Sequence, residues 1–169
     1  DFDDRSYGYD YLYIPEKFGK YEVSAIEKTS SWSASEVAIS NNNKYFKIVD
    51  DVLYDYDMTT LISYGSNKSD SKFVVPKSVK HIVPYAFNSY NVSTELKSII
   101  LNEDLLTIGD GAFYMSRITS FSIPKSVTKI GKNALNTFEI SKLKIHEDNK
   151  YYTMKNGNLL SKDLKTLIW

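Results

Sequence analysis

The sequence predicts a β-rich solenoid of stacked repeats with few or no long helices. An apolar pattern recurs at intervals of 22 to 26 residues, a second kind of unit occurs twice at a separation of 106 residues, and three of the four prolines fall at one phase of the repeat. A single repeat of this length cannot bury its apolar face alone, whereas stacked repeats share a continuous core.

The clearest repeat begins with a short strand pattern. Ile99 and Leu101 alternate with Ser98 and Ile100, so the first two should face the core and the last two the solvent. The same apolar, glycine and alanine types return after 22 residues, as in Leu96, Ile99, Leu101, Leu105, Ile108, Gly109, Ala112 and Phe113 against Ile118, Phe121, Ile123, Val127, Ile130, Gly131, Ala134 and Leu135. Side-by-side stacking of such strands predicts a parallel sheet on the concave face.

The unit that occurs twice predicts two inserted β-meanders, at 43–64 and 149–169. Both begin with Asn-Lys-Tyr and end with Thr-Leu-Ile, and they align without gaps. Asp50-Asp51 and Asn156-Gly157 should form the first turn of each meander. The chain is therefore expected to be a single domain over 1–169, with six units starting near residues 9, 34, 70, 96, 118 and 140.

Two features of the turns complete this prediction. Short polar side chains follow most strands by three residues, and we expect them to accept hydrogen bonds from N–H groups inside the solenoid: Asn42, Ser78, Asp104, Ser126 and Asp148. The first unit differs from the others, because a five-residue insertion follows Pro15 and delays the next apolar residue, Val23.

The charge balance argues against several kinds of partner. Lysine plus arginine equals aspartate plus glutamate, at 21 each, so the basic surface typical of nucleic-acid binding is not expected. No segment approaches the roughly 18 consecutive apolar residues of a membrane span, and we expect no membrane insertion. The absence of cysteine excludes disulfides and zinc–thiolate sites.

Catalytic and metal-binding chemistry is also not expected. The two histidines, His81 and His146, lie in different units and at different repeat phases, and no nucleophile or phosphate-binding motif is present. The acidic run Asp50, Asp51, Asp55 and Asp57 could suggest calcium, but only one carboxylate, Asp163, is kept in the second copy of this unit. We therefore expect no catalytic residues, no metal site and no cofactor.

The segment from Ile123 to Gly131 resembles the BspA-like leucine-rich repeats, whose consensus reads roughly I-P-x-S-V-T-x-I-G-x-x-A-F and is followed by an L-x-x-I-x-L strand. Two positions depart from this pattern: Leu135 replaces phenylalanine, and Val83 replaces glycine. The resemblance covers nearly the whole chain and implies the leucine-rich-repeat horseshoe class. It also implies a secreted or surface-attached protein associated with adhesion, and the family offers no shared catalytic residues. Because no polar residue closes the array after Ile168, the chain is further expected to be a fragment of a longer repeat protein.

Outward strand residues of the concave face form the candidate binding site: Tyr11, Tyr13, Ser98, Ile100, Ser120, Ser122, Lys142 and Lys144. The predicted register joins them into two continuous columns, one through Glu36 and Lys72 and the other through Ala38 and Val74. Exposed tyrosine beside small polar residues is typical of recognition surfaces. The alternative is that the two tyrosines pack under a preceding repeat.

The predicted function is a non-catalytic protein-binding or adhesion module. Its partner would be a surface protein of a host or neighbouring cell, or a glycan. The alternatives are a structural spacer and a carbohydrate-binding accessory domain of a cell-surface enzyme, in which Tyr11 and Tyr13 stack on sugar rings. Weak self-association is expected at the C-terminal edge, since the final meander ends on Leu167-Ile168-Trp169 and no polar residue closes the array.

Overall fold

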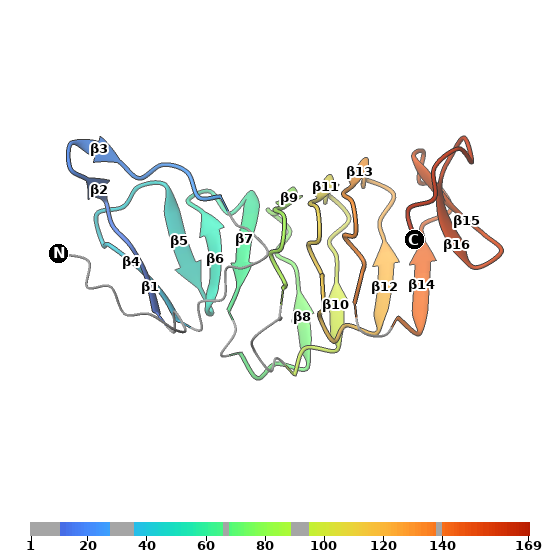
Figure 1. The fold of residues 1–169 in the computed structure, drawn as a ribbon, viewed down its shortest axis with the longest axis horizontal. Coiled ribbons are helices and arrows are strands. Elements are labelled where there is room, and N and C mark those ends of the chain that lie inside the picture. Colours follow the sequence, from blue (N-terminus) through green and yellow to red (C-terminus); the bar gives the residue numbers. More distant parts are fainter. Residues whose placement is uncertain (1–10, 28–35, 66–67, 89–94, 138–139) are drawn as a thin grey trace.

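A computed structural model describes residues 11–27, 36–65, 68–88, 95–137 and 140–169. These residues contain strands and turns but no helix, and the strands stack into the predicted solenoid (Figure 1). The predicted starts near residues 9 and 34 lie outside the described residues. The strands are β1 Tyr11–Ile14, β2 Lys17–Phe18, β3 Tyr21–Glu22, β4 Glu36–Ile39, β5 Phe46–Val49, β6 Val52–Asp55, β7 Thr60–Tyr64, β8 Lys72–Val74, β9 His81–Ile82, β10 Ser98–Ile100, β11 Thr107–Ile108, β12 Ser120–Ile123, β13 Lys129–Ile130, β14 Lys142–Ile145, β15 Tyr152–Lys155 and β16 Asn158–Ser161.

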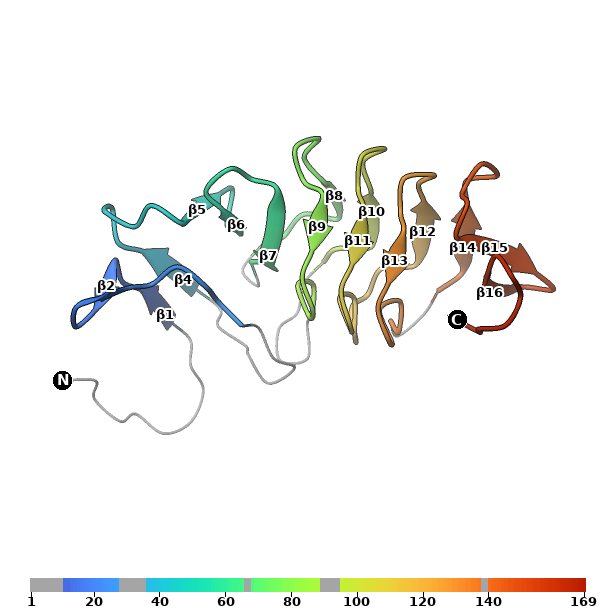
Figure 2. The same cartoon turned by 90° about the horizontal axis from the view of Figure 1, so that it is seen from above.

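Each of the three coils that begin near residues 70, 96 and 118 contributes one strand to each of two sheets, and these strands are parallel to one another within each sheet. The first sheet has the order β14-β12-β10-β8, and β9, β11 and β13 lie in a second layer opposite it (Figure 2). The registers pair equivalent repeat positions, such as Ile99 with Phe73 and Phe121 with Leu143. The predicted parallel strand sheet is therefore confirmed.

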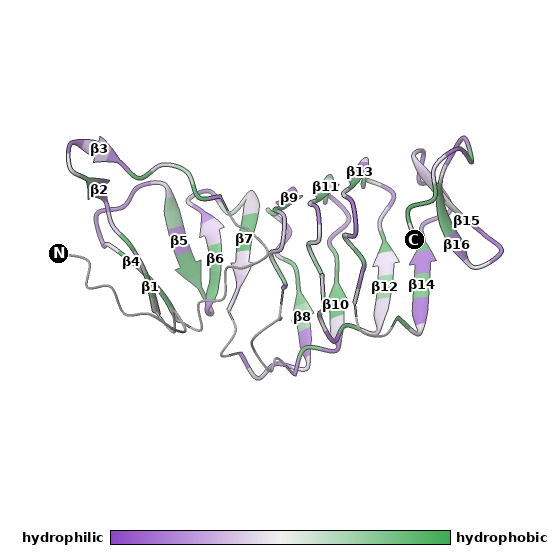
Figure 3. Ribbon diagram, viewed as in Figure 1, coloured by the Kyte–Doolittle hydropathy of each residue, from purple (hydrophilic) through white to green (hydrophobic). Residues whose placement is uncertain are grey.

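Apolar residues from both layers meet in one core. Phe113 is fully buried and stacks on Phe87 of the preceding coil and against Phe121, with 4.9 Å between ring centroids in both pairs. The strand alternation places Ile99 in this core and Ile100 at the surface. Figure 3 shows this alternation as separate apolar bands on β12 and β14, whereas β8 and β10 end in a continuous apolar stretch; β14 is the most hydrophilic of the four strands in the first sheet.

Glycine at the coil return permits close stacking. A Cβ atom on Gly109 would lie 2.4 Å from the backbone nitrogen of Pro84 in the preceding coil, so no larger residue fits without a shift. Val83 occupies the position of Gly109 in the coil before it. The neighbour that precedes Val83 is β7 of the first meander and not another coil return. The other departure from the consensus, Leu135, is buried in the position that phenylalanine takes in the earlier coils.

The two meanders share one geometry. Their first turns place two residues at positive φ, Asp50 and Asp51 at 49° and 58° and Asn156 and Gly157 at 52° and 80°, as a two-residue hairpin requires. The third run of each meander pairs at the same position, Tyr54 with Leu61 and Leu160 with Leu167. The second pairing is an isolated bridge, whereas β7 is a full strand held on its other side by β9.

The first meander divides the solenoid, so the prediction of two continuous outward columns is wrong. Strands β6 and β7 are buried on both faces. Val52, Tyr54 and Leu61 contribute to the main core, whereas Leu53 and Ile62 join a second apolar cluster under β1 and β4. Strands β1 and β4 consequently form a separate two-stranded sheet, and β5 and β6 lie between this sheet and β8 (Figure 1).

The short polar side chains predicted to form hydrogen bonds with backbone groups inside the solenoid are the wrong residues. Asparagines at other positions form these hydrogen bonds instead. The side-chain nitrogen of Asn149 donates to the carbonyl oxygens of Pro124, at 2.9 Å, and Val127, at 3.0 Å, in the preceding coil. Asn43 and Asn102 make the same pair of contacts with the coils before them. These side chains reach one coil back, and the predicted set holds only Ser126 in a comparable bond, donated to the carbonyl of Leu105.

Candidate binding surfaces

The outward face of β8, β10, β12 and β14 brings together six of the eight predicted site residues. Ser98, Ser120 and Lys142 form one row of adjacent residues, and Ser122 pairs with Lys144 in the next row. Ile100 precedes Ser122 in that second row, one strand earlier.

Two outward residues of β8, Lys72 and Val74, belong to this surface but were not among the predicted site residues, although the predicted columns pass through both. Val74 pairs directly with Ile100, and the two side chains are 57% and 44% exposed. The apolar pair therefore lies at one end of the face beside the exposed Lys72, serines occupy the middle, and Lys142 and Lys144 occupy the other end. The outward phase of Lys72 and Val74 in the repeat was the signal that could have identified them. We call this surface, made of Lys72, Val74, Ile100, Ser98, Ser120, Ser122, Lys142 and Lys144, the strand face.

The two predicted tyrosines are not part of the strand face. Tyr11 and Tyr13 lie in β1, which pairs with β4 in the separate sheet. The side chain of Tyr13 is 46% exposed, and its neighbours Leu12 and Ile14 pack into the second apolar cluster. The structure therefore places Tyr13 on a surface of its own, away from the serine and lysine rows.

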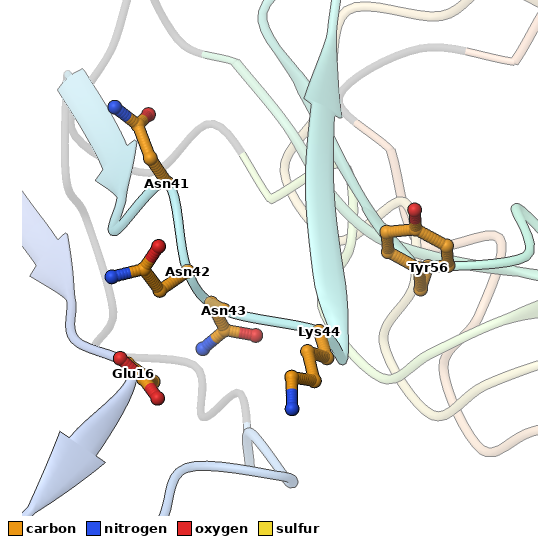
Figure 4. A pocket seen from close by; sticks show the side chains of 6 residues that line it. All are labelled: Glu16, Asn41, Asn42, Asn43, Lys44 and Tyr56. Atoms are coloured by element: carbon orange, nitrogen blue, oxygen red, sulfur yellow. The ribbon is translucent and has the colours of Figure 1, made fainter.

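A polar hollow of about 580 Å³ lies between the first coil and the first meander. Glu16 faces the row of Asn41, Asn42 and Asn43, and Tyr56 stands on the other side (Figure 4). In the second meander the positions of Asn41, Asn42 and Tyr56 hold Glu147, Asp148 and Lys162. Neutral amides and an aromatic ring are thus particular to the first copy, although the buried asparagine, Asn43 or Asn149, is kept in both.

The insertion after Pro15 forms a hairpin with two large exposed aromatic residues. Strands β2 and β3 pair antiparallel, and Gly19, at φ 62°, begins the turn between them. Phe18 is 67% exposed and Tyr21 is 68% exposed. The insertion was recognised from the sequence but was assigned no role. Two aromatic residues in a segment that the other coils lack were the signal that could have identified it as a candidate binding element.

Charged and titratable groups give no sign of a metal centre. Among the described residues, no group of three histidine, aspartate or glutamate side chains is arranged to hold a metal ion. The acidic run is engaged in turn structure, because Asp55 accepts hydrogen bonds from the Thr59 hydroxyl at 2.6 Å and the Thr60 amide at 2.9 Å. Burial opposes ionisation of Asp55, but these hydrogen bonds outweigh it and lower its pKa. No described helix is long and apolar enough to span a membrane.

Comparisons with known proteins agree with this architecture. The chain resembles a leucine-rich repeat protein from Eubacterium ventriosum, with 30% sequence identity, a TM-score of 0.59, and coverage of 81% of this chain and 36% of that one. It shares its fold with the pneumococcal vaccine antigen PcpA, at 24% identity and a TM-score of 0.60, over 83% of this chain and 40% of that one. The chain thus spans less than half of either protein.

Sequence comparisons give the family. A search of curated protein sequences found no significant match. The model of the BspA type leucine-rich repeat region matches residues 63–167 in six copies, and the match begins at the end of the first meander. This match covers more than half of the chain and agrees with the stacked parallel strands. The chain belongs to the BspA-type leucine-rich repeat family.

Proposed function

We propose that this chain is a non-catalytic protein-binding module of a secreted or surface-attached protein, and that the strand face is its contact surface. The observation that carries the proposal is the adjacent pair Val74 and Ile100, exposed beside serines and lysines on a flat parallel sheet. Apolar side chains surrounded by polar ones have the composition of protein interfaces, which combine an apolar centre with a polar rim.

The geometry of the face supports a protein partner. Strands β8, β10, β12 and β14 present their outward side chains at regular spacing on a rigid backbone, so little conformational freedom is lost on binding. The exposed lysines Lys142 and Lys144 would meet acidic groups of the partner and increase the association rate. Membership of the BspA-type family supports a location at a cell surface or outside the cell.

Binding of the labelled chain to host extracellular matrix and to intact host cells tests the proposal. The double variant Val74→Ser with Ile100→Ser should lose at least about tenfold in affinity, since a few apolar anchor residues commonly carry most of the binding free energy of an interface. Leu106→Ser is the matched control, because Leu106 is exposed beside β11 in the other layer. Equal binding by the double variant and the control would reject the strand face as the contact surface.

A glycan is a second candidate ligand, and it is favoured by the hollow in Figure 4. Asn41 and Asn42 offer amide donors and acceptors to sugar hydroxyls, and the exposed ring of Tyr56 offers a stacking surface. Tyr56→Ala should then abolish any signal on a glycan array, whereas Tyr151→Ala, an exposed tyrosine of the second meander, should leave it intact. A purely structural spacer would show no saturable binding in either experiment.

A further inference from the structure

The hairpin of β2 and β3 is an insertion in the first coil that leaves the hydrogen bonds between this coil and the next one in place. Seven residues separate Pro15 from Val23, whereas two separate Pro124 from Val127. The Asn43 side chain nevertheless donates to the carbonyls of Pro15, at 2.9 Å, and Val23, at 3.4 Å, just as Asn149 bridges Pro124 and Val127. The amide of Val23 also bonds to the carbonyl of Glu16 at 2.9 Å and closes the base of the hairpin. The core therefore does not require the inserted residues.

The two faces of the hairpin differ in their surroundings. Directly opposed residues share a face, so Lys17 and Glu22 lie on one side and Phe18 and Tyr21 on the other. The hydroxyl of Tyr45 on the first meander donates to the Glu22 carboxylate, and this bond raises the pKa of Tyr45. The Lys17–Glu22 side is thus turned toward the solenoid, and the aromatic pair points away from it.

The hairpin stands at one end of the molecule, where a partner can approach it freely. Figure 1 shows β2 and β3 as the outermost strands beyond β1 and β4. Insertions into single repeats commonly supply binding loops, and aromatic residues are enriched among interface residues that contribute strongly to affinity. Both aromatic side chains are about two-thirds exposed and lie outside the two apolar clusters.

The charges beside the aromatic pair favour a protein over a membrane. Residues 16–22 hold two lysines and two glutamates, so the hairpin lacks the cluster of positive charge that draws a protein to anionic lipid. Lys17 forms an ion pair with Glu16 at 3.6 Å, and Glu22 is bonded to Tyr45. Lys20 lies 5.3 Å from the centre of the Tyr21 ring and has no carboxylate partner within the part of the chain that the structure describes.

We propose that the hairpin of β2 and β3 is a second interaction element, separate from the strand face, which packs Phe18 and Tyr21 against an apolar segment of a protein partner. A carboxylate next to that segment would pair with Lys20. The aromatic residues supply buried apolar area at a small cost in side-chain entropy, and the lysine sets the charge that the partner must present.

Selection from a phage-displayed library of random linear peptides against the intact chain tests this proposal. Two variants remove the hairpin surface: Phe18→Ser with Tyr21→Ser, and a replacement of residues 16–22 by Lys-Ser, the two residues found between Pro124 and Val127. Both should keep the melting temperature of the parent within a few degrees, because Asn43 can still bridge the two ends of the coil. The variant Lys20→Glu tests the charge.

The expected result is a set of peptides that combine apolar and acidic residues and bind the parent. Their affinity should fall at least about tenfold for both hairpin variants and for Lys20→Glu, and should be unchanged for Val74→Ser with Ile100→Ser. Failure to recover any peptide, or equal binding to the hairpin variants, would overturn the proposal. Hairpin-dependent co-sedimentation with phosphatidylcholine or phosphatidylserine vesicles would overturn the choice of a protein partner.

Discussion

The side chain of Asn149 is hydrogen bonded to the carbonyl oxygen of Pro124, one coil earlier, at 2.9 Å. A proline at this repeat position ends the strand without donating a backbone hydrogen bond, and its carbonyl still needs a partner. Pro15, Pro76 and Pro124 each receive an asparagine amide from the following unit, through Asn43, Asn102 and Asn149. Proline in one coil and asparagine in the next therefore form a recurrent link between neighbouring units.

Removing one of these links should destabilise the domain. Asn43 also accepts hydrogen bonds from the amides of Tyr45 and Phe46, so Asn43→Ala would leave one buried backbone group, the Phe46 amide, and three part-buried ones without this partner. Each such group costs about 1–3 kcal/mol, and we expect a total loss of about 2–4 kcal/mol in the free energy of unfolding. Urea denaturation measures this loss. Asn42→Ala, at the adjacent exposed position, is the control and should cost less than about 0.5 kcal/mol.

The stacked aromatic residues give a second prediction. Phe113→Ala should reduce the free energy of unfolding by about 3–5 kcal/mol, because the side chain is fully buried between Phe87 and Phe121. Ile100→Ala on the outward face of β10 should cost far less. Equal losses for the two variants in urea denaturation would contradict the assignment of inward and outward positions.

Asp55 should make part of the stability depend on pH. Hydrogen bonds from Thr59 and Thr60 lower its folded pKa below the usual value of 3.8, so the stabilisation is fully present above that pH and is lost as the pH falls through the lowered pKa. In the second meander Ser161 occupies this position and accepts the equivalent amide bond from Thr166 at 2.9 Å. We therefore expect Asp55→Ser to fold and to lose less stability on acidification than the parent.

Thermal melts between about pH 6 and pH 2 measure this difference in acid sensitivity. Asp57→Ser makes the same change in charge at an exposed position two residues away and should follow the parent. A melting temperature that falls equally in the parent and in Asp55→Ser would show that the two hydrogen bonds do not stabilise the ionised carboxylate.

The edge of the second meander should support weak self-association. Leu167 is 64% exposed, whereas Leu61, at the same position of the first meander, is fully buried beside β9. Light scattering over a concentration series should show an increase in apparent mass that disappears in the double variant Leu167→Lys with Trp169→Lys. Leu106→Lys is the control at an unrelated exposed position. A parent that stays monomeric throughout the series would exclude association through this edge.

The repeat period determined most of the fold, because a continuous core requires every coil to place the same residue types at the same phase. Phe113 and Leu135 were identified as equivalent from the sequence, and both are buried. The first turn of each meander could also be predicted from the sequence, since Asp-Asp and Asn-Gly tolerate the positive φ that a two-residue hairpin needs.

Only the tertiary structure decided which surfaces are continuous. Alternation placed Tyr13 and Ile100 on outward positions, but it could not show that β6 and β7 are buried on both faces and separate the sheet of Tyr13 from the sheet of Ile100. The asparagine–proline hydrogen bonds could not be predicted from the sequence for a similar reason. Asn102 lies at a different position of the repeat from Asn43 and Asn149, and only the folded backbone brings each of the three to the carbonyl of a proline one coil earlier. Local pattern fixes which way a side chain points, and the packing between distant segments fixes what it meets.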